Sequence, residues 1–180
     1  MTARRTARVT LEQPTRQRET EFLQRVQASQ RLHHPWLKAP STREQFRDLV
    51  VRARGERHAT FFVCTVAASE LVGVINVNEI VRGLFQSAYL GYYAFEPFSR
   101  SGYMSEGLAL VLDQAFGSLG LHRLEANVQP GNLPSIRLVS GLGFRREGHS
   151  PRYLKIAGRW RDHERWAILA DHWPKKRRGR

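Results

Sequence analysis

The 9 residues from 96 to 104 combine side-chain types that can bind an anion. They read Glu-Pro-Phe-Ser-Arg-Ser-Gly-Tyr-Met and lie between an expected strand and an expected helix. The first backbone N–H groups of a helix have no partner within the helix, and the helix dipole adds positive potential there. Arg100 can add a bidentate contact to a phosphate, and Gly102 lets a phosphate approach the backbone. The alternative is an ordinary strand-to-helix loop of similar composition.

Other common phosphate and metal motifs are absent from the sequence. It contains neither the GxxxxGK[ST] pattern of P-loop proteins nor the GxGxxG pattern of dinucleotide-binding folds. A phosphate site without either pattern indicates a different cofactor that contains a pyrophosphate. The 7 histidines lack zinc-ligand spacing such as HExxH, so we expect no metal.

Several other reactive side chains are better explained by packing. Cys64 lies in an apolar run and is expected to be a small buried side chain. His33, His34 and Trp36 could line a substrate cleft, but we expect this loop to pack on its own aromatic side chains. His163 follows Asp162 and is expected to belong to a network between paired strands.

The hydrophobic pattern predicts the elements that must position these residues. Alternating and β-rich runs predict strands at residues 9–13, 61–66, 71–77, 88–95 and 122–128, and two more within 145–170. Helical spacing predicts helices at 15–31, from 41 onward, at 103–119 and at 132–142. Thr15 and Ser41 are the expected N-caps of the first two helices, and Gly120 is the expected C-cap of the third. This order predicts a single α/β domain with a mixed sheet flanked by helices.

The composition is that of a globular protein with a large positive charge. The chain has 180 residues, of which 41% are hydrophobic and 25% charged, and its net charge is +13. These values exclude a disordered or fibrous chain. The charge favours a polyanionic partner, which could be nucleic acid, a nucleoprotein or an anionic membrane surface. The single cysteine fits a reducing compartment, and no apolar run is long enough for a transmembrane helix. The basic N-terminus lacks the apolar part of a secretory signal, so we expect a cytoplasmic location and no membrane partner.

The last residues form a separate basic segment. Residues 175–180 read Lys-Lys-Arg-Arg-Gly-Arg, and the chain stays basic without them. We therefore divide the chain into a domain at 1–174 and a basic C-terminal tail at 175–180. A solvated tail is the simpler interpretation, and attraction to a substrate embedded in RNA is the functional one.

The stretch from Ala88 to Gly148 resembles the core of the GNAT superfamily, the acetyl-CoA-dependent N-acetyltransferases. The pyrophosphate-binding loop of that family is usually Q/R-x-x-G-x-G/A. This sequence has Ser99 at the first position, Gly102 at the glycine and Met104 where Gly or Ala is usual. The resemblance implies acetyl-CoA as co-substrate and a mixed, mostly antiparallel sheet whose two central strands splay apart.

The downstream half of this stretch resembles the family more closely. Asn132-x-x-Ser135 opens a helix that ends Leu142-Gly143-Phe144, and Glu147-Gly148 follow, an ending characteristic of the family. Three further pieces are similar to the ribosomal-protein-alanine N-acetyltransferases, the Rim type: residues 81–83 together with 88–92, residues 121–124, and residues 158–163.

The Rim-type resemblance implies that the acceptor is the N-terminal α-amine of a protein, either a ribosomal protein or a nucleoprotein, and a homodimer is an open possibility. The same branch also contains acetyltransferases for small amines, polyamines and peptide antibiotics. From another class, the chain could be an RNA- or ribosome-binding module that has lost catalysis.

Acetylation of an α-amine demands less of a base than acetylation of lysine does. The pKa of an α-amine, about 7.7–8, leaves it partly neutral near pH 7.

The resemblance assigns roles to residues that the pattern alone explains only as loop or helix-cap residues. The residues that it implies for acetyl-CoA binding are Phe95, Arg100, Ser101, Gly102, Tyr103, Met104, Asn132 and Ser135. A backbone N–H near Phe95 would polarise the thioester carbonyl, and Asn132 would hold the pantetheine arm or a water. Many members use a tyrosine seven residues after the asparagine as the acid, but Val139 stands there, so Ser135 is the expected replacement. The general base stays open between Glu79, Glu125 and water.

Overall fold

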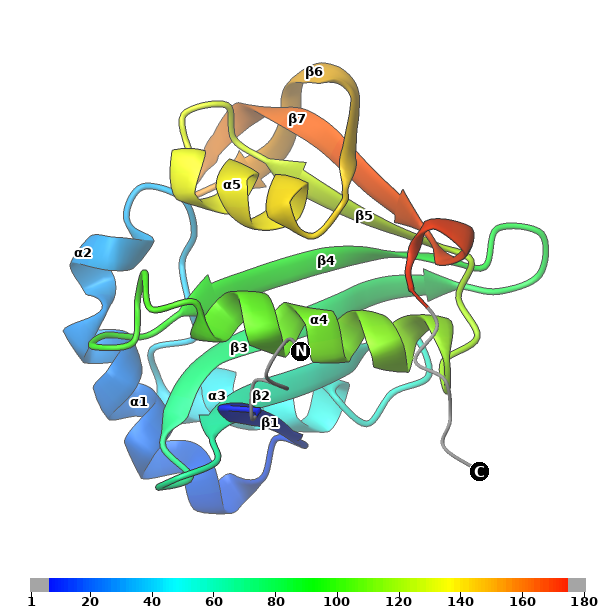
Figure 1. The fold of residues 1–180 in the computed structure, drawn as a ribbon. Coiled ribbons are helices and arrows are strands. Elements are labelled where there is room, and N and C mark those ends of the chain that lie inside the picture. Colours follow the sequence, from blue (N-terminus) through cyan, green and yellow to red (C-terminus); the bar gives the residue numbers. More distant parts are fainter. Residues whose placement is uncertain (1–6, 175–180) are drawn as a thin grey trace, which may run out of the picture.

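The computed structural model describes residues 7–174, which form an open seven-stranded sheet with helices on both faces (Figure 1). The strands are β1 (Val9–Glu12), β2 (Ala59–Thr65), β3 (Leu71–Val81), β4 (Ser87–Ala94), β5 (Arg123–Val128), β6 (Arg145–Ile156) and β7 (Arg159–Leu169). The helices are α1 (Glu19–Ala28), α2 (Gln30–His33), α3 (Arg43–Arg52), α4 (Tyr103–Phe116) and α5 (Leu133–Gly141), with 3₁₀ turns η1 (Arg16–Arg18) and η2 (Ala170–His172). The strand order is β1-β2-β3-β4-β5-β7-β6.

The pairing of β4 with β5 decides where the sheet opens. These two strands are parallel, whereas every other neighbouring pair in the described sheet is antiparallel. Their register ends at Leu90↔Ala126, although β4 continues to Ala94 and β5 to Val128. The central strands therefore diverge, which confirms the predicted mixed, mostly antiparallel sheet with a splay between them.

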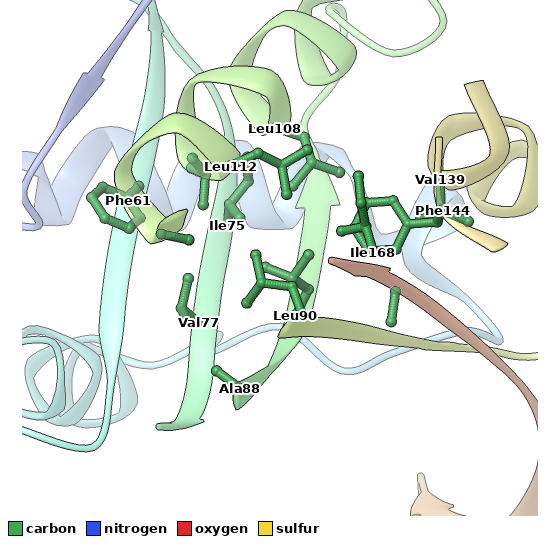
Figure 2. Close-up of a cluster of buried hydrophobic side chains, with 14 of the residues drawn as sticks. Phe61, Ile75, Val77, Ala88, Leu90, Leu108, Leu112, Val139, Phe144 and Ile168 are labelled. Atoms are coloured by element: carbon green, nitrogen blue, oxygen red, sulfur yellow. The ribbon is translucent and has the colours of Figure 1, made fainter. Parts of the chain in front are cut away.

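Alternation along the strands builds one hydrophobic core on each face of the sheet. Ile75 and Val77 of β3 belong to the cluster that contains Leu108 and Leu112 of α4 (Figure 2). Val74, which directly precedes Ile75, belongs to the cluster on the other face, which α1 and α3 cover. The largest aromatic residues of this second cluster are Phe22, Phe46, Phe62, Tyr93 and Phe95. The two cores fix β3 and β4 between helices and so hold the splay in place.

Helix α4 follows the predicted apolar stripe and lies close against the sheet. A Cβ atom at Gly107 would lie only 2.7 Å from the methyl carbons of Val63 on β2, so a residue without a side chain permits this approach. The expected C-cap at Gly120 is wrong, because the helix ends at Phe116 and Gly117 caps it. Gly120 instead ends the next turn, where its N–H donates to the Gly117 carbonyl over 3.2 Å.

The predicted helix from residue 15 to residue 31 is divided into η1, α1 and α2. Thr15 precedes η1 and makes no side-chain capping bond. The break between α1 and α2 falls at Ser29, which is fully buried. Its hydroxyl accepts a hydrogen bond from the Glu96 N–H over 2.9 Å, so a tertiary contact with the loop after β4 fixes the break.

Two further expectations concern the ends of elements and of the chain. Helix α3 begins after Thr42, whose hydroxyl accepts the Gln45 N–H over 3.2 Å, so the cap lies one residue after the predicted Ser41. No helix within residues 7–174 is long and apolar enough to cross a membrane. The basic segment at 175–180 lies outside the described residues, so its separation from the domain stays a prediction.

Candidate active site

The N-terminus of α4 presents backbone N–H groups that no side chain caps. Gly102 is the N-cap residue, with φ 81°, and it makes no side-chain capping bond because it has no side chain. Arg100 also has a positive φ, 60°, so the loop turns sharply just before the helix. The 14-residue helix therefore directs its positive end toward the space in front of Arg100 and Gly102.

Arg8 supports this loop through its side chain. Its guanidinium donates to the Ser101 carbonyl over 3.1 Å, forms an ion pair with Glu106 at 2.6 Å and lies 4.5 Å above the Tyr103 ring. Ser101 and Tyr103 thus contact Arg8. Like Phe95, they do not line the groove that lies between this loop and α5. The other five residues expected to bind the co-substrate all line it.

A groove of about 730 Å³ runs from this loop to α5, and we call it the α4 groove. Its lining residues include Ser99, Arg100, Gly102, Met104, Asn132, Ser135 and Leu138. Met104 departs from the usual Gly or Ala of the loop, and Gly73 of β3 makes room for it. A Cβ atom at Gly73 would lie 2.5 Å from the Met104 sulfur.

A second groove of about 600 Å³ lies on the other side of the splay, and we call it the β6 groove. Its lining residues include Lys38, Asn76, Asn78, Glu79, Asn127, Tyr153, Leu154, Ile156 and His163. The two grooves share six lining residues: Trp36, Leu37, Tyr92, Tyr93, Asn132 and Ser135. The splay is therefore the place where a molecule in one groove can meet a molecule in the other.

Ser135 and Tyr92 lie in hydrogen-bond contact at this junction. The Tyr92 hydroxyl is 2.6 Å from the Ser135 hydroxyl, and either oxygen can be the donor. Asn132 caps α5, because its side-chain oxygen accepts the Ser135 N–H over 3.3 Å. Burial raises the pKa of Tyr92 to about 12, against a smaller lowering by the Ser135 hydrogen bond. The phenol therefore keeps its proton at neutral pH.

Tyr92 is a site residue that the sequence did not single out. Its position follows from the register of β4, which places Tyr92 opposite Ile75 on the face that α4 covers. Val139, which stands where many family members have a tyrosine, is fully buried in the core. A tyrosine therefore does reach Ser135, but from β4 and not from α5.

The backbone N–H of Phe95 is not available to a bound molecule. It donates to the Val72 carbonyl of β3 over 2.8 Å, and the Phe95 side chain is completely buried. The expectation that Phe95 lies in the site is therefore wrong. Because successive residues of a strand direct their backbone groups to opposite sides, the preceding Ala94 faces the splay. Its carbonyl oxygen lies 2.8 Å from Nε2 of His33.

The loop after α2 spans the splay, so the prediction that it packs on its own aromatic residues is wrong. His33 is buried edge-on against Tyr93, with ring centroids 5.4 Å apart. Burial lowers the pKa of His33, against a smaller rise from the hydrogen bond to Ala94. Trp36 lines both grooves, and its carbonyl accepts a hydrogen bond from the Gln129 side chain over 2.9 Å. This bond ties the α2–α3 loop to the far side of the opening.

The two candidate bases do not lie at the junction. Glu79 lines the β6 groove but is half exposed and forms an ion pair with Arg57. Glu125 pairs with Arg123 at 2.8 Å and is not a lining residue of either groove. His163 pairs with Ser150 across β6 and β7, as expected, and it also lines the β6 groove.

The described residues also bear on the packing and metal expectations. Cys64 is completely buried, as predicted, and burial raises the pKa of its thiol to about 12. Among residues 7–174 no group of three or more His, Cys, Asp or Glu side chains could hold a metal ion.

Comparisons with known proteins agree with this geometry. A profile of the acetyltransferase (GNAT) domain matches residues 8–145. The chain is 36% identical to the probable N-acetyltransferase YjcK of Bacillus subtilis over 127 residues, which cover 71% of this chain and 70% of that protein. It is 38% identical to the ribosomal protein uS5-alanine N-acetyltransferase of Escherichia coli over 104 residues, which cover 58% of this chain and about half (54%) of that protein.

Solved structures with the same fold extend over nearly the whole chain. RimJ of Mycobacterium smegmatis, in complex with CoA-disulfide, superposes with a TM-score of 0.83 at 29% identity, covering 93% of this chain and 85% of that one. Spermidine N-acetyltransferase of Vibrio cholerae, with CoA and spermine, has a TM-score of 0.78 at 21% identity, covering 92% of this chain and 98% of that one, which is a likeness of fold alone. With a matching profile over most of its length and relatives named as N-acetyltransferases, this chain belongs to the GNAT acetyltransferase family.

Proposed function

We propose that this acetyltransferase transfers the acetyl group of acetyl-CoA to the N-terminal α-amine of a protein, and specifically of a ribosomal protein. The observation that carries the proposal is the meeting of two grooves at Ser135 and Tyr92. Each reactant can enter from its own side of the splay, and the shared residues lie where the two would touch. The relatives named as uS5-alanine N-acetyltransferase and RimJ support the choice of acceptor.

The residues of the α4 groove fit acetyl-CoA. A pyrophosphate suits the uncapped N-terminus of α4, where Gly102 has no side chain in the way and Arg100 can pair with the charge. The groove then leads from this loop past Met104 to Asn132 and Ser135. When bound, acetyl-CoA supplies an activated thioester at the junction of the grooves.

The reaction forms a bond between the amine nitrogen and the acetyl carbon, breaks the carbon–sulfur bond and leaves a thiolate that needs a proton. Ser135 is the proposed donor of that proton, and Tyr92, still protonated at neutral pH, supports it through their hydrogen bond. Asn132 holds the first turn of α5, and so the Ser135 backbone, in place. An α-amine is partly neutral near pH 7, so a water in the β6 groove is a sufficient base, and neither Glu79 nor Glu125 is required.

The lining of the β6 groove favours a peptide over a polyamine. Of its described lining residues only Lys38 and Glu79 carry full charges, and Glu79 is already paired with Arg57. A polyamine with several ammonium groups requires unpaired carboxylates, whereas a peptide N-terminus requires hydrogen-bonding groups. Asn76, Asn78 and Tyr153 supply such groups.

The charge of the chain supports an acceptor that is embedded in RNA. The net charge of +13 favours association with phosphates, and we propose that residues 175–180 are a basic tail outside an acetyltransferase domain at 1–174. The buried, unreactive Cys64 suits a reducing compartment, so we place the reaction in the cytoplasm.

Intact-mass measurement of acetyl transfer tests this function directly. The purified chain is incubated with acetyl-CoA and a panel that contains short peptides with free N-termini, the same peptides with blocked N-termini, spermidine and spermine. We expect one added acetyl group on the free peptides and none on the blocked peptides, even where these contain lysine. A kcat/KM for spermidine equal to or above that for every peptide would overturn the choice of acceptor.

A further inference from the structure

The hairpin of β6 and β7 forms one wall of the β6 groove. Tyr153, Leu154 and Ile156 of β6 line that groove. Ile156 pairs with Arg159 and Leu154 with Arg161, so these two arginines share the face of the hairpin that borders the groove. A molecule that binds at the end of this hairpin therefore lies beside the groove proposed for the acceptor.

The end of the hairpin, residues 151–161, carries four basic side chains and no Asp or Glu. We call Arg152, Lys155, Arg159 and Arg161 the hairpin cations. Within residues 7–174 none of them forms an ion pair. Asp162 follows directly, but it accepts the backbone N–H of Arg152 and lies 3.5 Å from His149.

Eight arginines elsewhere in the described fold form ion pairs with carboxylates. They are Arg8, Arg18, Arg25, Arg43, Arg47, Arg57, Arg123 and Arg146. Other arginines of the described fold, such as Arg16 and Arg54, also lack an ion pair, but the end of the hairpin gathers four such cations within the eleven residues 151–161, which contain no carboxylate side chain. Such a cluster is costly in the free protein, and an anion that binds there relieves the repulsion.

Trp160 adds a large exposed aromatic surface to this cluster. Its side chain is 59% exposed, and it pairs directly with Lys155 across the two strands, so these two side chains lie on the opposite face of the hairpin from Arg159 and Arg161. An indole next to an ammonium group stacks well on a nucleobase, while the cation contacts the adjacent phosphate. An acidic protein segment would use the cations but would leave the indole in water.

We propose that the hairpin cations and Trp160, which lie on both faces at the end of the hairpin, bind single-stranded RNA that passes around this end next to the β6 groove. Arg152, Lys155 and Arg159 contact phosphates, and Trp160 stacks on a base. The surface would hold the RNA that surrounds an acceptor protein while its N-terminus enters the groove. The role of this surface in presenting the acceptor rests on the proposed function. The binding of RNA itself does not, so each of these two claims can be disproved without the other.

Fluorescence anisotropy with a labelled single-stranded RNA of about twelve nucleotides tests the binding on the full chain. The variant Arg152→Gln/Arg159→Gln removes two contacts, and Arg16→Gln/Arg54→Gln is a matched control, because both of its arginines are exposed and lie together on another surface. The slope of log K against log salt should decrease by roughly 1.4 in the first variant, at about 0.7 per contact, and stay unchanged in the control. Trp160→Ala should weaken binding by about 5- to 100-fold, and Trp160→Phe should restore most of it.

Two outcomes would overturn the proposal. One is an equal loss of RNA affinity in the Arg152→Gln/Arg159→Gln variant and in its control, which would mean that only total charge matters. The other is displacement of the RNA by polyglutamate of matched charge at equal concentration, which would assign the surface to acidic proteins. If the protein binds RNA as described but transfers no acetyl group to any peptide, the RNA-binding surface is supported and the proposed function is overturned.

Discussion

The hydroxyl of Tyr92 lies 2.6 Å from the hydroxyl of Ser135 across the opening between β4 and α5. The two residues come from different elements, 43 positions apart in the sequence, and both line the two grooves. The pair therefore lies at the junction of the two grooves. Its two hydroxyls form a short chain along which a proton can be supplied to a leaving group.

Removal of either hydroxyl should slow the chemical step. Ser135→Ala and Tyr92→Phe should each lower kcat by about 10²-fold or more, the usual effect of losing a general acid. The affinity for acetyl-CoA should stay within a few-fold, because the contact matters mainly as the thiolate develops. Steady-state kinetics give kcat, and calorimetric titration gives the affinity. If the hydroxyls act as one unit, the double variant should be no slower than the slower single variant.

Ser140→Ala is the matched control for Ser135→Ala. Ser140 lies on the same helix, is exposed, and its hydroxyl donates only to the Arg137 carbonyl. Its loss should leave kcat unchanged. Wild-type turnover in Ser135→Ala would show that Ser135 is only a residue of the first turn of α5.

Gly102→Asp should abolish stabilisation by acetyl-CoA. The substitution places a side chain and a negative charge at the N-terminus of α4, where the pyrophosphate is proposed to bind. Acetyl-CoA at 100 times its Kd should stabilise the wild-type chain by about 2.7 kcal/mol, and thermal melts with and without it measure this. Gly120→Asp is the control, because Gly120 also has a positive φ, 60°, with open space around it. An equal loss of stabilisation in both variants would mean that charge alone weakens binding.

Helices and strands in which hydrophobic residues recur at a regular spacing could be predicted from the sequence, but the residues at which they end could not. The apolar stripe of α4 depends only on the spacing of residues within the helix, so it can be recognised from the sequence alone. The break at Ser29 depends on a hydrogen bond to Glu96, 67 positions away, and no local pattern encodes that contact. Ser41 and Thr42 both have a hydroxyl that can cap a helix, and the structure uses that of Thr42.

The site divides in the same way. Gly102, Asn132 and Ser135 were found through motifs that span only a few residues each. Tyr92 was missed because its position depends on the register of β4. The cleft-lining alternative for Trp36 was rejected in favour of packing, because its position depends on the path of a loop across the splay. Alternation along β4 was the signal available for Tyr92, since Leu90 and Tyr92 must share a face.

Gly107→Ala should destabilise the fold although alanine favours a helix. The new methyl group would lie 2.7 Å from the methyl carbons of the buried Val63, and such overpacking costs about 1–3 kcal/mol. Urea unfolding measures the loss, and Val63→Ala in the same chain should recover part of it. Gly141→Ala on α5 is the control, because a Cβ atom there meets nothing within 4 Å, and it should stabilise the fold by up to ~1 kcal/mol. If the decreases in the free energy of unfolding caused by Gly107→Ala and by Val63→Ala simply add in the double variant, the two side chains are not in close contact.

Mild acid should destabilise the protein through two buried histidines. Burial lowers the pKa of His33 and of His163 below the usual 6.5. The unfolded chain therefore takes up protons at these sites at a higher pH than the folded chain does. The free energy of unfolding should decrease as the pH falls below about 6.5, by up to ~1.4 kcal/mol per pH unit for each histidine. Denaturant unfolding between about pH 7.5 and about pH 5.5 measures this slope.

Substitutions that keep the hydrogen bonds but cannot titrate isolate the effect. His33→Gln retains a donor for the Ala94 carbonyl, and His163→Asn retains one for the Arg161 carbonyl. The double variant should have a flatter profile over this range. Glu147→Gln should keep the wild-type slope there, because the Arg123 hydrogen bond lowers the pKa of Glu147 and its contribution is lost only below about pH 4.5. A double variant with the full wild-type slope would assign the titration to groups other than these histidines.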